Sequence, residues 1–335
     1  MSPVVTWIST GGTIEAVGHD RLDLVSYGET GRRITPAEIL AEIPELSWVA
    51  EVRPMPWADS GRAQLPPSHA WTLEDLAALA RLVRQVAAAS DGVVVTCGTN
   101  GLEETAYFLD RVLDGTVPVV VTGAMRPSSA LGPDGPANLL GAVRVAAHPR
   151  TRGLGVLVVL DDAILPARDV TKSATYHRGA FRSPVFGPLG FTDADGEVVL
   201  RRRPVPTSAR ARFELDELPA VLPRVDVIAS YLGADGALVD AAVAAGSRGI
   251  VHAGLGAGHG SPAEWAALKR AAEAGVLVCQ SSRVGSGRVV AHGPSRAGGF
   301  IAGGDLGPWK ARILLCLALA RGDDAAAVQA VFEAA

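Results

Sequence analysis

Short apolar runs alternate with longer segments of helical periodicity along most of the chain. Over residues 71–89, leucine and valine recur every three or four positions, which is the spacing of one buried helix face. Thr72 and Asp75 resemble a capping box at the start of that helix. The apolar runs that we expect to be strands are 4–9, 49–55, 92–96, 117–123 and 155–160, and the helices among them are 71–89, 102–113 and 135–147.

Strands that alternate with helices predict a parallel α/β sheet with right-handed connections. The stretch 204–222 interrupts this alternation, because it is rich in proline and mixed in charge. We therefore expect an N-terminal α/β domain over 1–203, a linker over 204–222 and a smaller α/β domain over 223–335. The strands expected in the second domain are 225–231, 249–254 and 276–282, and its helices are 237–245, 262–275 and two near 308–320 and 323–334.

Composition and charge narrow the classes of function. The chain has 335 residues, a hydrophobic fraction of 48% and a net charge of −4, so a basic nucleic-acid surface is not expected. No apolar run is long enough for a membrane span, and the amino terminus lacks a signal-peptide pattern. Cys97, Cys279 and Cys316 match neither a zinc pattern nor a disulfide framework. Together these features predict a cytoplasmic protein that binds neither nucleic acid nor membrane.

Two expected strands end in turns that contain threonine. The stretch "TCGTNGLEET" (96–105) is typical of a strand, a tight turn and a helix, which places Thr99 and Asn100 where parallel sheets bind ligands. The first strand ends in "STGGTIEA" (9–16), which places Thr13 in a similar position. Each hydroxyl is a candidate for chemistry, although threonine is also an ordinary turn and cap residue.

The glycine-rich stretch "GLGAGHG" (254–260) superficially suggests a dinucleotide loop. However, the dinucleotide fingerprint with its fixed spacing is missing from the first strand–helix unit, and no Walker sequence occurs. We therefore expect no nucleotide cofactor.

Several motifs occur together in one order over nearly the whole chain. They are "TGGTIE" (10–15), "GTNGLEETAYFLD" (98–110), "VTGAMRPSSALGPDGPANL" (121–139), "RDVTKSAT" (168–175), "FGPLGF" (186–191), "SSRVGSGRV" (281–289) and "ARILLCLAL" (311–319). In this respect the sequence resembles the bacterial L-asparaginase family of threonine amidohydrolases.

The resemblance implies a larger N-terminal domain with a flavodoxin-like parallel sheet and a smaller C-terminal α/β domain. It also implies a homotetramer built as a dimer of dimers, with each site between the N-terminal domain of one subunit and the C-terminal domain of its neighbour. The expected partner is a small-molecule amide substrate, and neither a metal nor an organic cofactor is expected.

The resemblance also implies roles for individual residues. Thr13 and Thr99 take the places of the two catalytic threonines, and Lys172 takes that of the lysine paired with the second threonine. A lysine can act as a base only when it is neutral, which requires burial or a nearby cation. Tyr27, in a long polar loop after the first strand, matches the family's mobile tyrosine, which orients Thr13.

For substrate binding, the resemblance implies that Ser68 and His69 contact the substrate carboxylate, with His69 replacing a glutamine of the family pattern. For His69, a purely structural role in the loop before a helix is an equally good interpretation.

The stretch "CGTNG" departs from the family's "HGTDT". Asn100 stands where the family has an aspartate that supports the lysine and binds the substrate's α-ammonium. We expect Asn100 to cap the following helix, with Glu103 completing the box. The loss of charge leaves four interpretations open: an amidohydrolase for an amide without a free α-ammonium, a weakened asparaginase, an inactive relative, or a substitution introduced into an asparaginase.

Two other classes of protein remain possible from sequence. One is the asparaginase-like subunit of a tRNA-dependent amidotransferase, which we disfavour because the first strand begins near residue 4 and the charge does not suit tRNA. The other is a binding protein of this fold without turnover. Retention of Thr13, Thr99 and Lys172 argues against it, whereas Asn100 argues for it.

Overall fold

The computed structural model describes residues 2–61, 66–205 and 211–335. The chain divides into two compact units, Met1–Ser208 and Ala209–Ala335. The division falls within the stretch expected to be a linker, of which residues 206–210 lie outside the described part. Phe213 and Leu215, from the same stretch, are buried, and Phe213 lies under the guanidinium of Arg321.

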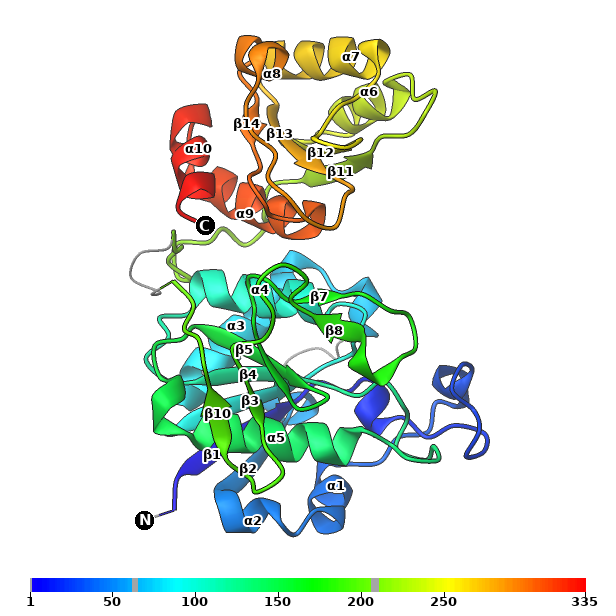
Figure 1. Cartoon of the computed structure of the whole chain (residues 1–335), viewed down its shortest axis with the longest axis vertical. Helices are drawn as coiled ribbons and strands as arrows, with labels where there is room; N and C mark the ends of the chain where they lie inside the picture. Colours follow the sequence, from blue (N-terminus) through cyan, green and yellow to red (C-terminus); the bar gives the residue numbers. More distant parts are fainter. Residues whose placement is uncertain (1, 62–65, 206–210) are drawn as a thin grey trace. The chain divides into compact units, whose positions relative to one another are not determined.

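The sheet of the first unit is parallel in its main part, as predicted (Figure 1). Five parallel strands lie in the order β2-β1-β3-β4-β5, which is the flavodoxin-like order. Their bounds are Val4–Ser9 (β1), Glu51–Pro56 (β2), Gly92–Thr96 (β3), Val119–Thr122 (β4) and Val156–Leu160 (β5).

Three short antiparallel strands that the sequence analysis missed extend this sheet beyond β5. They are β6 (Ala163–Pro166), β9 (Gly190–Thr192) and β10 (Val198–Leu200). Each is only three or four residues long, which is too short to show a clear alternation in sequence.

Helices cover both faces of the sheet, so its central strands are apolar throughout (Figure 1). α3 (Leu73–Ala87) and α4 (Leu102–Val112) pack together on one face. On the other face lie α5 (Gly135–Ala147), α1 (Pro36–Glu42) and α2 (Leu46–Val49), whose apolar side chains share a core with Trp7. The predicted capping box of α3 is confirmed, since Thr72 and Asp75 accept each other's backbone N–H.

The second unit contains a smaller parallel sheet in the order β11-β12-β13-β14. Its strands are Val225–Ala229, Gly249–Gly254, Leu277–Ser282 and Ile301–Ala302 in that order. Its helices are α6 (Ala237–Ala244), α7 (Pro262–Glu273), α8 (Gly293–Ala297), α9 (Pro308–Arg321) and α10 (Ala325–Glu333). Among the described residues, no helix is long and apolar enough to cross a membrane.

A buried side-chain hydrogen bond joins β1 to β3 immediately before the two threonine turns. The indole Nε1 of Trp7 donates to Thr96 Oγ1 over 2.9 Å, and both residues are fully buried. Because water cannot replace the acceptor, this bond fixes how the two strand ends lie relative to each other.

Thr96→Val keeps the side-chain volume but leaves the indole N–H unpaired. We expect it to reduce the free energy of unfolding by about 1–3 kcal/mol. In a Trp7→Phe background, which lacks the N–H group, the same substitution should cost much less. Urea denaturation of the four proteins of this double-mutant cycle measures the coupling energy between Trp7 and Thr96. If Thr96→Val lowers the free energy of unfolding equally in both backgrounds, the hydrogen bond does not contribute as expected.

Candidate active site

The order of the parallel strands reverses between β1 and β3, and ligands of open α/β sheets bind at such a switch point. Thr13 follows β1, and Thr99 follows β3. Gly12 has a φ of 97°, and a Cβ there would lie 2.7 Å from the backbone nitrogen of Gly98. The two turns therefore approach each other backbone to backbone, which requires glycine at position 12.

A cavity of about 810 Å3 opens at this point of the first unit. The structure brings all seven sequence-predicted site residues to its walls, namely Thr13, Tyr27, Ser68, His69, Thr99, Asn100 and Lys172. These residues come from five separate segments of the chain, and tertiary packing alone brings them together.

Thr13 begins a short 3₁₀ turn, Thr13–Glu15, and only 8% of its surface is exposed. Its Oγ1 lies 2.9 Å from the Tyr27 hydroxyl, and either oxygen can be the donor. The loop that carries Tyr27 thus reaches back to the end of β1, where the Tyr27 and Thr13 hydroxyls lie within hydrogen-bond distance.

Thr99 is equally buried, and Lys172 reaches it from a different part of the chain. The Nζ of Lys172 donates to Thr99 Oγ1 and to Asn100 Oδ1, over 3.0 Å in each case. Lys172 lies in β7 (Thr171–Lys172), which pairs with β8 (Phe181–Arg182) in a small hairpin that the sequence analysis did not predict.

Burial lowers the pKa of the Lys172 ammonium, and the nearby Glu103 carboxylate partly opposes this by favouring the charged form. Glu103 Oε2 also accepts the backbone N–H of Lys172 over 2.7 Å. Glu103 therefore both fixes the backbone of Lys172 and favours the charged form of its side chain. Its proximity to Lys172 could not be found in the sequence, because the two residues lie 69 positions apart.

The prediction that Asn100 caps α4 is wrong. Gly101 occupies the N-cap position, and no side chain caps the helix there. Asn100 is exposed and uses its Oδ1 for Lys172 instead, while Glu103 turns to the backbone of Lys172 rather than closing a capping box. Both side chains thus bind Lys172 of the hairpin instead of the N-terminus of α4.

Ser68 and His69 lie in a 3₁₀ turn, Ser68–Ala70, that faces the Thr99 turn. Ser68 Oγ accepts the backbone N–H of Gly101 over 3.3 Å, which ties this turn to the start of α4. His69 is exposed at the cavity wall. Ser68 is thus held by the fold, whereas no hydrogen bond to another described residue fixes His69.

The "TGAMRP…DGPAN" motif builds a further wall of the cavity around a single buried carboxylate. Asp134 accepts the backbone N–H groups of Met125 and Arg126, and Asn138 Nδ2 donates both to Asp134 and to the carbonyl of Gly123. This network fixes the loop after β4, and Met125 from this loop lines the cavity. The motif therefore shapes the site through its backbone.

Cys97 precedes the Thr99 turn and is a possible competing nucleophile. It is fully buried, and burial raises the pKa of its thiol to about 12. Because the thiolate is the reactive form, Cys97 is inert near neutral pH.

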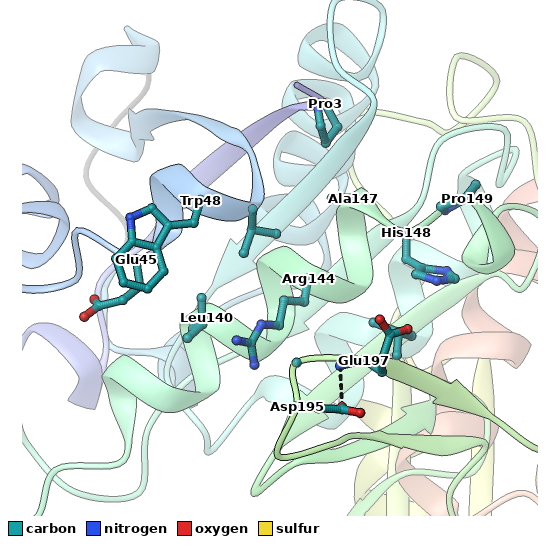
Figure 2. A pocket seen from close by; sticks show the side chains of 13 residues that line it. Pro3, Glu45, Trp48, Leu140, Arg144, Ala147, His148, Pro149, Asp195 and Glu197 are labelled. Carbon is teal, nitrogen blue, oxygen red and sulfur yellow. Dashed lines mark hydrogen bonds between the residues drawn. The ribbon is translucent and has the colours of Figure 1, made fainter. Parts of the chain in front are cut away.

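A second cavity of about 460 Å3 lies elsewhere on the first unit (Figure 2). It is lined by Trp48 of α2, Arg144 at the end of α5, His148 after it, and Glu197 of the turn before β10. None of the seven candidate residues is among the described residues that line it. In the part of the chain that the structure describes, no group of three or more His, Cys, Asp or Glu side chains could hold a metal ion.

Comparison with known proteins gives matches over both units. Residues 4–206 match the family model "Asparaginase, N-terminal", and residues 224–332 match "Glutaminase/Asparaginase C-terminal domain". The chain is 36% identical over 334 residues to L-asparaginase 2 of Escherichia coli (strain K12), and the alignment covers 99% of this chain and 93% of that protein.

Other relatives agree with this result. The glutaminase-asparaginase of Pseudomonas aeruginosa is 34% identical over 334 residues, covering 98% of this chain and 89% of that protein. The crystal structure of a probable cytoplasmic L-asparaginase from Campylobacter jejuni matches with a TM-score of 0.90 and 34% identity over 99% of both chains. The order of motifs, the flavodoxin-like sheet and these full-length matches agree, and the chain belongs to the asparaginase family.

Proposed function

We propose that the protein is an amidohydrolase that converts a side-chain-type amide of a small molecule to the carboxylate and ammonia through a threonine nucleophile. The observation that carries this proposal is the pair of buried threonine hydroxyls in one cavity, each within 3.0 Å of a group that can take part in proton transfer. The relatives named L-asparaginase and glutaminase-asparaginase support the reaction class.

Amide hydrolysis needs a nucleophile, a base and a route for the proton. In the proposed sequence, Thr13 Oγ1 forms a bond to the amide carbon and gives its proton to Thr99, which passes one to neutral Lys172. The proton returns by the same route to the amide nitrogen, and the C–N bond breaks to release ammonia. Water then attacks the resulting ester and gives one proton to the departing Thr13 oxygen, which restores the hydroxyl, while the other proton leaves with the carboxylate product. Tyr27 orients Thr13.

Ser68 and His69 stand at the cavity wall as the proposed contacts of the substrate carboxylate. Asn100 holds Lys172 and faces the substrate. A binding protein without turnover remains the second candidate, because Asn100 replaces the family's charged residue. The retained Thr99–Lys172 hydrogen bond favours the enzyme.

We further propose that the protein acts in the cytoplasm as a homo-oligomer, a dimer of dimers. The cysteines support the location, since Cys97, Cys279 and Cys316 are free and buried. One relative is the probable periplasmic L-asparaginase of Haemophilus influenzae, so family membership alone does not decide the location.

Thr13→Ala should lower kcat/KM for every hydrolysed amide by about 1,000-fold or more, because the nucleophile is removed. Thr13→Ser keeps a hydroxyl at the same position and should retain much of the activity. Ammonia release measures both, and circular dichroism verifies that the variants fold. An alanine variant with wild-type turnover would rule out Thr13 as the nucleophile.

If neutral Lys172 is the base, kcat/KM should rise with pH through the lowered pKa of this lysine. Glu103→Gln removes a charge that raises this pKa, so the rise should move to lower pH. Asn100→Asp adds a carboxylate beside Nζ, so the rise should move to higher pH. Initial rates of ammonia release across a pH series test both shifts, and profiles that coincide in all three proteins would exclude Lys172 as the base.

If each site requires two subunits, activity per chain should fall as the protein is diluted below its dissociation constant. Light scattering and ammonia release measured on the same dilution series test this dependence. Full activity in a sample that contains only monomer would contradict the proposed assembly.

A further inference from the structure

The described lining of the cavity includes positively charged side chains and no acidic side chain. Among the described residues that line the cavity, the basic side chains are Arg33, Lys172 and His69, and none is Asp or Glu. Glu103, the carboxylate near Lys172, is engaged with the backbone N–H of that residue and does not line the cavity. The walls that this chain provides therefore favour an anion and lack a partner for an ammonium group.

Asn100 presents a donor to the substrate. In the structure, Asn100 turns its Oδ1 toward Lys172 Nζ and accepts a hydrogen bond from it over 3.0 Å. The remaining polar group of the side chain is the NH2, which can only donate. A substrate ammonium would thus meet a second donor, whereas a substrate oxygen would find a hydrogen bond.

Arg33 is anchored next to the turn that carries Thr13. The backbone fixes its position, because residues Ala16 and Arg33 form an antiparallel bridge and Ile34 N donates to the carbonyl of Glu15. Its Nη1 lies 3.9 Å from Glu15 Oε2 and passes so close to Gly11 that a Cβ there would collide with it. Glu15 is itself buried and accepts a hydrogen bond from Ser9.

The guanidinium of Arg33 remains available to a ligand. Its side chain is 50% exposed, and within the described part of the chain it donates no hydrogen bond. An arginine stays protonated at every pH of interest and binds carboxylates with paired donors. Arg33 is thus a permanent positive charge with free donors at the cavity wall.

From these observations we propose that the substrate is an anionic side-chain amide that carries hydrogen or an oxygen acceptor where L-asparagine carries its α-ammonium. Arg33 attracts the carboxylate and holds it together with Ser68 and His69, and the NH2 of Asn100 donates to the acceptor. This inference rests on the proposed function for its reaction and adds the substrate class.

A matched series of three amides tests the substrate class. Succinamate, (S)-2-hydroxysuccinamate and L-asparagine share the scissile amide and the carboxylate and differ only in carrying hydrogen, hydroxyl or ammonium at one carbon. We expect kcat/KM to be about 10-fold or more higher for the first two than for L-asparagine. Asn100→Asp should shift the ratio toward L-asparagine by about 10–150-fold.

Binding to Thr13→Ala, measured by calorimetry with the same three amides, separates failure of the inference from failure of the proposed function. If Thr13→Ala binds the three amides in the predicted order but the native protein hydrolyses none of them, the reaction is refuted and the substrate class is supported. A native preference for L-asparagine, as would arise if a second copy of the chain supplied a carboxylate, overturns the inference. A ratio unchanged by Asn100→Asp overturns it as well.

Arg33→Gln tests whether the guanidinium of Arg33 binds the substrate carboxylate. Arg32→Gln is the matched control, because Arg32 is exposed and is not among the described residues of the cavity wall. Arg33→Gln should lower kcat/KM for succinamate by about 10-fold and leave that for the neutral amide butyramide unchanged. Arg32→Gln should change neither. Equal effects of the two variants on succinamate would show that Arg33 does not hold the carboxylate.

Discussion

The close approach of two turns at the point where the strand order reverses is the constraint on which the site depends. β1 and β3 are neighbours in the sheet, and their ends are tied by the Trp7–Thr96 hydrogen bond. Gly12 then allows its turn to touch the backbone of Gly98. Any side chain at position 12 would separate the turns, and Thr13 and Thr99 would no longer share a cavity.

The environment of Lys172 is a compromise between two opposing effects. Burial favours the neutral amine, which can act as a base, while Glu103 favours the ammonium and fixes the backbone of the hairpin. The neutral Asn100 adds a hydrogen-bond acceptor without adding charge. An aspartate in its place would strengthen the hold on the ammonium and would make the neutral form harder to reach. A single side chain thus influences both the charge state of Lys172 and the charge of the cavity wall.

Several parts of the fold and site were predictable from sequence because they depend on local patterns. The central strands are continuous apolar runs, and α3 carries both a helical stripe and a capping box. The threonines could be placed at strand ends from the glycine turns that follow those strands. The short strands β6, β9 and β10 were missed, because three or four residues do not show a period and their pairing depends on distant partners.

The sequence by itself determined the longer central elements and the family, and it indicated Thr13, Thr99 and Lys172 as candidate reactive groups, since these follow from local periodicity and from motifs in a fixed order. Only the tertiary structure decided which partners Asn100 and Glu103 take, and it alone brings Arg33 to the cavity wall. Asn100 and Glu103 were expected to cap a helix, but both interact with Lys172, which is 72 and 69 positions away in the sequence. A long side chain can bond only to the partners that packing brings within hydrogen-bond distance. The order of residues along the chain does not show which distant residues these are.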